Sequence, residues 1–229
     1  MFNGFTEETI QYFLDLKFHN NTDFFHASHD RYVEDVQHVF YSMIEELAPH
    51  MLKIDPAMEV RPHKCLSRIH RDTRFSRDKS PYRDHLWFLF RRAGEPREKS
   101  LFYYFELGPS RLSWGMGFWG ENREALDLFR KHMRTNPDGT LALIDDMELE
   151  KRNLALGGTV HKKMIVPPEI PSRLQKWYLL KDMYIGKVTP DYRIIYSEKI
   201  LKDVRRDFSA LAPLYRLLRG YADEAFANT

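Results

Sequence analysis

The chain has 229 residues, a formal net charge of +2 and one cysteine, Cys65. A chain of this length suits one large domain and buries enough apolar surface to fold without disulfides or structural metals. A single cysteine excludes an intramolecular disulfide and any zinc site built from several thiolates. A reducing compartment is therefore the natural location, and we expect a cytoplasmic protein.

Targeting and membrane-spanning segments are not evident. The segment Met1–Ile10 lacks the basic region and apolar core of a secretory signal. The longest apolar run, Leu86–Phe90, is far shorter than the run of about 20 residues that a membrane-spanning helix needs. We therefore expect a soluble protein with no membrane partner.

The N-terminal third has a helical pattern. Thr6 is a suitable N-cap, and acidic residues follow it in the first turn of the expected helix. The pair Asn20-Asn21 should end that helix. A second, longer helix is predicted from Asp23 or Ser28 to Leu52, because apolar residues recur there at helical spacing.

The middle of the chain is rich in aromatic and β-branched residues, which favour strands. We predict four strands, over Val60–Ile69, Asp84–Arg92, Leu101–Leu107 and Arg111–Phe118. Gly94 and Pro96 interrupt one connection, and Gly108-Pro109-Ser110 makes a tight link in another. Short links join antiparallel neighbours, so these strands should form a meander.

The last third returns to helices. They are predicted over residues 121–134, 140–151, 197–211 and 213–226, with an edge strand over 159–165. Grouped strands with helices on both sides indicate an α+β fold: a central antiparallel meander sheet on which helices from the N- and C-terminal thirds pack. We expect a single domain over residues 1–229. The absence of βαβ units, of G-x-G-x-x-G and of a P-loop argues against a nucleotide-binding fold.

Positive charge is concentrated in one part of the chain. Between Arg61 and Lys99 there are twelve Lys or Arg residues and five Asp or Glu residues, whereas the rest of the chain has 23 and 28. Such a concentration favours an anionic partner. The alternative is a solvated hairpin whose charges only prevent aggregation of strand edges.

Within this region, arginines recur at every third position, accompanied by a lysine and two aspartates: Arg68, Arg71, Arg74, Arg77, Lys79, Asp72 and Asp78. The apolar alternation that precedes them favours a strand that enters a loop near Thr73. Pro81 biases Ser80 toward an extended conformation, so a strand should resume after it. The segment Arg68–Tyr82 is therefore predicted as strand, loop and strand.

Guanidinium groups match the geometry of carboxylate and phosphate oxygens. We interpret the segment as an anion-binding site for a small phosphorylated or carboxylated ligand, in a binding protein or an enzyme. Its predicted ligand contacts are Arg68, Arg71, Arg74 and Lys79, with Tyr82 orienting the ligand and Asp72 and Asp78 fixing the arginine rotamers. No catalytic residue is indicated. The alternative is an internal ion network without a ligand.

The pattern R-x-x-R-D-x-R-F-x-x-D-K-x-x-Y, from Arg68 to Tyr82, resembles the signature of a conserved hypothetical bacterial family, domain of unknown function 2461. The pair Phe24-Phe25 that follows Asn20-Asn21 is similar to that family, as is Gly117-Phe118-Trp119 leading to Leu126 and Arg130. The resemblance covers nearly the whole chain. It implies no activity, so it supports the location of the site and leaves its chemistry open.

Metal and nucleophile sites are less favoured. His63, His70 and His85, with Asp72 and Asp84, fit no ligand spacing, and the arginines would oppose a divalent cation. We expect no metal and no cofactor. Cys65 near His63 is better explained as a packed thiol than as a nucleophile. Asp72 and Asp78 would be weak bases, because neighbouring arginines lower the pKa of a carboxyl.

A nucleic-acid or protein interaction module remains an alternative function. Trp114 and Trp119 beside the basic region would stack on bases if exposed, although large aromatic residues more often lie in the core. The stretch Lys199–Arg219 has six basic and two acidic residues, but a helix packed on the sheet explains it better than a nucleic-acid surface. The residues do not indicate the reaction or the oligomeric state.

Overall fold

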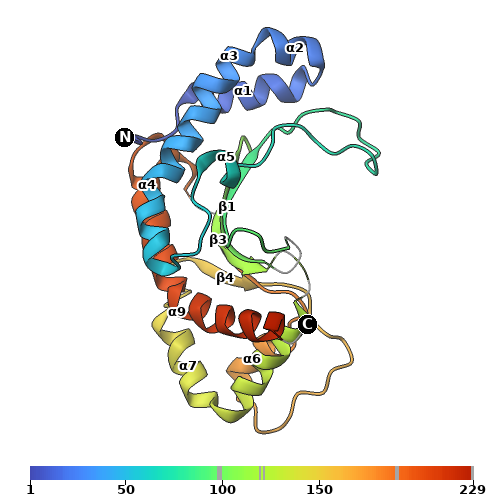
Figure 1. Cartoon of the computed structure of the whole chain (residues 1–229), viewed down its shortest axis with the longest axis vertical. Coiled ribbons are helices and arrows are strands. Elements are labelled where there is room, and N and C mark those ends of the chain that lie inside the picture. The colour runs from blue at the N-terminus through green and yellow to red at the C-terminus, as the bar shows by residue number, and fades with distance from the viewer. Residues whose placement is uncertain (97–99, 119, 121, 189–190, 228–229) are drawn as a thin grey trace. The chain divides into compact units, whose positions relative to one another are not determined.

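The computed structural model describes residues 1–96, 100–118, 120, 122–188 and 191–227 (Figure 1). The chain divides into two compact units. Unit 1 comprises Met1–Phe90, Tyr104–Trp114 and Thr189–Arg205, and unit 2 comprises Arg91–Tyr103, Gly115–Val188 and Arg206–Thr229. The expectation of a single domain stays a prediction.

One antiparallel sheet has the strand order β1-β2-β3-β5-β4. Its strands are β1 (Leu86–Phe90), β2 (Leu101–Gly108), β3 (Arg111–Phe118), β4 (Leu154–Gly157) and β5 (Tyr184–Lys187). The predicted α+β class and the β1-β2-β3 meander are confirmed. Neither β4 nor β5 was predicted, since each has only four residues. They extend the sheet beyond β3, with Gly115 opposite Gly186.

The helices of unit 1 begin at the predicted N-cap. Thr6 caps α1 (Glu7–Phe18) through a capping box with Thr9. The predicted break follows, because the Asn21 side chain accepts a hydrogen bond from the Phe24 N–H and begins a new helix. The long helix predicted from Asp23 or Ser28 to Leu52 begins after Ser28. Helical residues run without a break through α3 (His29–Arg31), the π-helix η1 (Tyr32–Gln37) and α4 (His38–Ile54), and the separate short helix α2 (Thr22–Ala27) precedes them.

Aromatic rings make the core of unit 1. The ring of Phe105 on β2 stacks on Phe5 and Phe88 at centroid distances of 5.8 and 5.3 Å, and Phe40 on α4 contacts it edge-on at 6.3 Å. These rings join the N-terminal helices to the strands. The core therefore holds α1 and the strands in place, and α1 and β3 contribute side chains to the site described below.

Unit 2 contains α6 (Arg123–Thr135), α7 (Pro137–Asp146), η3 (Ser172–Leu174) and α8 (Gln175–Tyr178). The short helix η4 (Tyr192–Tyr196) belongs to unit 1, and α9 (Lys199–Ala227) has residues in both units. In unit 2, Tyr103 packs between Phe208 and Tyr215 at centroid distances of 4.8 and 5.1 Å. The helix predicted from Glu121 begins at Arg123, because the Asn122 side chain caps it by accepting a hydrogen bond from the Ala125 N–H. Residue 121 lies outside the described residues.

Two predicted strands are wrong. The segment Val60–Ile69 contains the short helix α5 (Pro62–Cys65) and an isolated bridge from Leu66 to Phe88. Pro62 lies at the start of α5, where a helix does not need its missing N–H. The segment Thr159–Ile165 contains only the bridge from Val160 to Leu180.

Two helix boundaries also differ from the prediction. The helix predicted over residues 140–151 begins earlier, at Pro137, where the Asn136 side chain accepts a hydrogen bond from the Gly139 N–H. The two helices predicted around Pro213 form the one helix α9. Buried Leu211 and Leu214 flank this proline, and their packing outweighs the loss of one backbone hydrogen bond. Among the described residues, every helix is too short or too polar to span a bilayer.

Candidate functional site

The predicted signature segment forms a loop that runs out after α5 and returns into β1 (Figure 1). A bridge pairs His70 with Tyr82. The Arg71 N–H donates to the Pro81 carbonyl at 2.8 Å, and the Arg83 N–H donates to the Ile69 carbonyl at 2.9 Å. We call His70–Tyr82 the signature loop. The predicted strands at its two ends are reduced to this short antiparallel pairing.

The signature loop is anchored at Tyr82. The Asn20 side chain donates to the Tyr82 carbonyl and accepts from the Tyr82 N–H, both at 2.9 Å. The Tyr82 ring is buried and stacks on Phe25 of α2 at a centroid distance of 4.2 Å. One amide side chain therefore supplies both of the hydrogen bonds that a neighbouring strand would provide.

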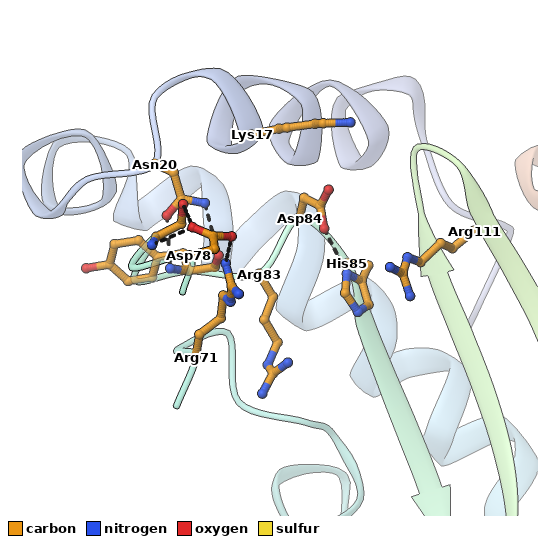
Figure 2. A pocket seen from close by; sticks show the side chains of 10 residues that line it. Lys17, Asn20, Arg71, Asp78, Arg83, Asp84, His85 and Arg111 are labelled. Atoms are coloured by element: carbon orange, nitrogen blue, oxygen red, sulfur yellow. Dashed lines mark hydrogen bonds and ion pairs between the residues drawn. The ribbon is translucent and has the colours of Figure 1, made fainter. Parts of the chain in front are cut away.

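A pocket of about 400 Å³ lies in unit 1 beside this anchor (Figure 2). Its lining residues come from α1, the signature loop, the segment after it and β3: Lys17, Asn20, Arg71, Asp78, Ser80, Tyr82, Arg83, Asp84, His85 and Arg111. Four of them are cationic and two are carboxylates, so with His85 neutral the lining has an excess of two positive charges. The remaining polar groups are an amide and hydroxyls.

On one side of the pocket, Arg71 forms an ion pair with Asp78 (Figure 2). Asp78 also accepts hydrogen bonds from Ser80, at 2.9 Å from the backbone N and 2.6 Å from the hydroxyl. The Ser80 hydroxyl and the Arg71 guanidinium hold the pKa of Asp78 well below its usual range. This carboxylate stays ionised and fixes the direction of the arginine.

Two further cations come from the segment after the loop and from α1. The Arg83 guanidinium lies over the Trp87 ring at 4.7 Å from the ring centroid, a contact that holds a cation without neutralising its charge. Lys17 extends from the last turn of α1, and its charge helps to lower the pKa of Asp84. Neither residue was among the predicted ligand contacts.

On the other side, Asp84 and His85 form a pair (Figure 2). The two residues are neighbours in sequence, and His85 Nδ1 lies 2.8 Å from Asp84 Oδ1. His85 Nε2 lies 3.5 Å from Glu106 on β2, which also pairs with Arg111 at 3.3 Å. Burial opposes ionisation of Asp84, but the hydrogen bond and charge of His85 outweigh it and lower the pKa of Asp84. The histidine is therefore held by an ionised carboxylate.

The backbone around His85 is tightly packed. A Cβ placed on Gly108, at the end of β2, would lie 2.5 Å from His85 Cβ, so only glycine fits there. The His85 ring also stacks on Trp87 at a centroid distance of 5.7 Å. The side chain of His85 is only 15% exposed. These contacts restrict the ring to one orientation.

Of the residues predicted to bind or support a ligand, Arg71, Tyr82 and Asp78 line the pocket and the others do not. Arg74 pairs with Asp72 at 2.7 Å, and Lys79 donates to the Thr73 carbonyl at 2.9 Å. Arg68 is exposed. The ligand contacts predicted from spacing are thus divided: Arg71 lines the pocket, whereas Arg74 lies on the outer part of the loop. Phe75, also on this outer part, is 95% exposed.

The lining residues missed from the sequence fall into two groups. Arg83, Asp84 and His85 directly follow the signature. Asp84 and His85 had been considered only as metal ligands, and the succession of cation, acid and imidazole was a usable signal. Lys17 and Arg111 lie far away in sequence and carry no such signal. They reach the pocket only because the aromatic core joins α1 and the strands.

The other predicted sites have ordinary structural explanations. Trp114 is buried, so its ring is not available for stacking on a base. Trp119 lies outside the described residues. The buried Cys65 donates from its thiol to the Glu59 carbonyl at 3.2 Å. In the described part of the chain, His, Cys, Asp and Glu form no group of three or more that would hold a metal ion.

Comparison with known families gives one match. The sequence profile of a family described as "Conserved hypothetical protein (DUF2461)" matches residues 8–217. The match spans most of the chain, as the resemblance of its signature predicts. A search of curated proteins finds no match.

Proposed function

Since the chain belongs to the conserved hypothetical family DUF2461, whose description names no activity, we propose a function from the pocket itself: it binds a small phosphorylated or carboxylated ligand. The observation that carries the proposal is the convergence of Lys17, Arg71, Arg83 and Arg111 on one pocket of about 400 Å³. They come from three separate parts of the sequence, so local sequence bias does not explain their meeting.

The charges of the lining favour an anion over a neutral ligand. Asp78 and Asp84 offset only part of the positive charge, and Asp78 is already engaged with Arg71 and Ser80. Even when Glu106, the partner of Arg111, is counted, three carboxylates face four cations. Like charges gathered around a cavity repel each other, and an anion between them relieves this repulsion. A guanidinium also matches phosphate and carboxylate oxygens with two parallel hydrogen bonds. Asn20 and Ser80 add uncharged polar groups to the same lining.

The first experiment is a thermal-shift screen over inorganic phosphate, nucleotides and carboxylates, followed by calorimetric titration of any hit. A ligand that binds only the native state raises the Tm, by the equivalent of about 2.7 kcal/mol at a concentration of 100 Kd. Arg71→Gln and Arg83→Gln should each lower the affinity by about 10-fold or more, because each removes a charge-assisted hydrogen bond.

Arg193→Gln is a matched control. Arg193 belongs to unit 1, is exposed and pairs with Asp191 at 3.0 Å, away from the pocket. The Arg193→Gln variant should bind a ligand found in the screen with wild-type affinity. The proposal is wrong if the screen gives no shift, or if both pocket variants bind as tightly as the control.

Arg74→Gln tests the wider site predicted from the sequence. A loss of affinity in this variant would show that the outer part of the signature loop closes on the ligand. Wild-type affinity would limit the site to the pocket. If the chain bound a nucleic acid in place of a small ligand, the affinity would fall steeply with rising salt concentration. Substitution of Arg68, Arg74 or Arg77 would in each case weaken that binding.

A further inference from the structure

We propose that the pocket hydrolyses phosphate monoesters, with His85 as the general acid that protonates the leaving oxygen. This inference rests on the proposed binding function and adds to it a substrate class and a reaction. Two observations support it: the pair of His85 with Asp84, which anion binding alone does not require, and the charge of the lining.

The charge of the lining matches the substrate. A phosphate monoester is a dianion near neutral pH. In the protonated state from which His85 donates, four cations and the imidazolium face three carboxylates, namely Asp78, Asp84 and Glu106, so the excess is two positive charges. A carboxylate would neutralise only one of them. Phosphoryl transfer passes through a loose transition state whose charge is spread over three oxygens, so catalysis consists mainly of positioning and electrostatic stabilisation. Arg71, Arg83 and Arg111 are groups of the kind that stabilise such a charge.

The geometry of His85 suits proton donation. Its Nδ1 lies 2.8 Å from the ionised Asp84, which fixes the Nδ1–H tautomer and leaves Nε2 as the nitrogen that transfers a proton. Nε2 is 3.5 Å from Glu106, a contact too long for a strong hydrogen bond. The ring therefore lies between two carboxylates, and the nitrogen that transfers the proton is not tightly bound to either of them.

The reaction needs no component besides water. A water oxygen attacks the phosphorus atom, and the bond between phosphorus and the ester oxygen breaks. The ester oxygen takes the Nε2 proton of His85 and leaves as an alcohol. The attacking water becomes part of the released inorganic phosphate, and a proton lost from it or from solvent restores the imidazolium. No electron is transferred.

The test compares two esters with different leaving groups, phenyl phosphate and p-nitrophenyl phosphate, on the full chain. A general acid matters most for the poorer leaving group, phenol. His85→Gln should slow phenyl phosphate hydrolysis by about 100-fold or more and p-nitrophenyl phosphate hydrolysis by about 10-fold or less. Its calorimetric Kd for inorganic phosphate should stay within about threefold of wild type, because the cations remain in place.

The control His63→Gln replaces an exposed histidine outside the pocket and should hydrolyse both esters at the wild-type rate. If the wild type binds phosphate but hydrolyses neither ester, or if His85→Gln slows both esters equally, the inference is wrong and the proposed binding stands. If the wild type does not bind phosphate and carboxylates bind in its place, the inference fails while binding of an anion survives. If no anion binds, both fail.

Asp84 is a positioning residue in this scheme and has a separate readout. Asp84→Asn should lower kcat with little change in KM, because the imidazole loses the carboxylate that fixes its tautomer and orientation. Asp84→Glu should restore part of the rate. A rise in KM with kcat unchanged, or no rescue by Asp84→Glu, would contradict this role.

Discussion

At the scale of single residues, one arrangement of charges recurs in the chain. Arg74 donates to Asp72 from its backbone N and its guanidinium, and Arg193 makes the same three contacts with Asp191. An aspartate two residues before an arginine thus forms these three hydrogen bonds where the backbone between them turns. The pairing of Arg74 with Asp72 reflects local geometry and by itself marks no binding site.

The Asp72 carboxyl should titrate at an unusually low pH. The hydrogen bonds and charge of Arg74 lower its pKa to about 2 from an ordinary value of 3.8. Because the folded-state pKa is depressed, the contribution of this pair to the loop conformation is complete above about pH 4 and disappears as the pH falls through about 2. Carbon-detected NMR titration of the Asp72 carboxyl measures the midpoint.

The variant Arg74→Gln should return the midpoint of Asp72 toward 3.8, while Asp191, whose partner Arg193 is unchanged, keeps its lowered pKa. A midpoint for Asp72 that does not move in this variant would mean that the backbone N–H, and not the guanidinium, holds the carboxylate.

At the scale of elements, the position of the signature loop depends on the link between α1 and α2. Asn20 in this link holds both backbone groups of Tyr82, and Phe25 of α2 covers the Tyr82 ring. The loop therefore carries Arg71 and Asp78 to the pocket through a contact 62 residues apart in sequence. A pattern within the loop does not reveal this contact.

Asn20→Ala should destabilise the protein by about 1–3 kcal/mol, because two hydrogen bonds worth about 0.5–1.5 kcal/mol each are lost. Urea denaturation followed by tryptophan fluorescence measures this loss. Asn3→Ala, a change at an exposed asparagine, serves as control and should stay within about 0.5 kcal/mol of wild type. Equal stability of the two variants would show that the packing of Tyr82 on Phe25 is enough to hold the loop.

At the scale of the whole molecule, the two units share three elements of the chain. The division passes through β2 between Tyr103 and Tyr104, through β3 between Trp114 and Gly115, and through α9 between Arg205 and Arg206. If one unit unfolded alone, each of these elements would be cut short, and a shortened strand or helix is too weakly stabilised to stay folded. We therefore propose that the chain unfolds as one domain, as its sequence predicts.

Differential scanning calorimetry should show a single transition whose calorimetric and van't Hoff enthalpies agree. Asp207→Ala should lower its midpoint without splitting it, since this variant breaks the pair between a fully buried Asp207 and Lys187 at 2.9 Å in unit 2. Removing one partner of a buried pair costs about 3–5 kcal/mol. Lys202→Ala, which breaks the exposed pair with Glu198, should cost less than about 1 kcal/mol. Two separate transitions would contradict the single domain.

Features that depend on neighbouring residues follow from the amino-acid sequence alone. The cap at Thr6, the break at Asn20-Asn21, the strand Arg111–Phe118 and the tight link before it all follow from local geometry. The concentration of positive charge in this region also followed, because charge density is a property of composition, and Arg71, Asp78 and Tyr82 of the region line the pocket. The strand predicted over Val60–Ile69 was wrong, because its apolar alternation is equally compatible with a short helix that starts at a proline.

Which of these charges face one cavity depends on how distant segments of the chain pack together. Spacing placed Arg68, Arg71, Arg74 and Lys79 in one group, whereas the fold turns Arg71 toward the pocket and leaves Arg74 paired with Asp72 on the outer loop. Lys17 and Arg111 join Arg71 because a core of aromatic rings brings α1 and β3 together with the loop. Local propensity acts over a few residues, whereas a binding site is assembled by burial of apolar surface between segments far apart in the chain.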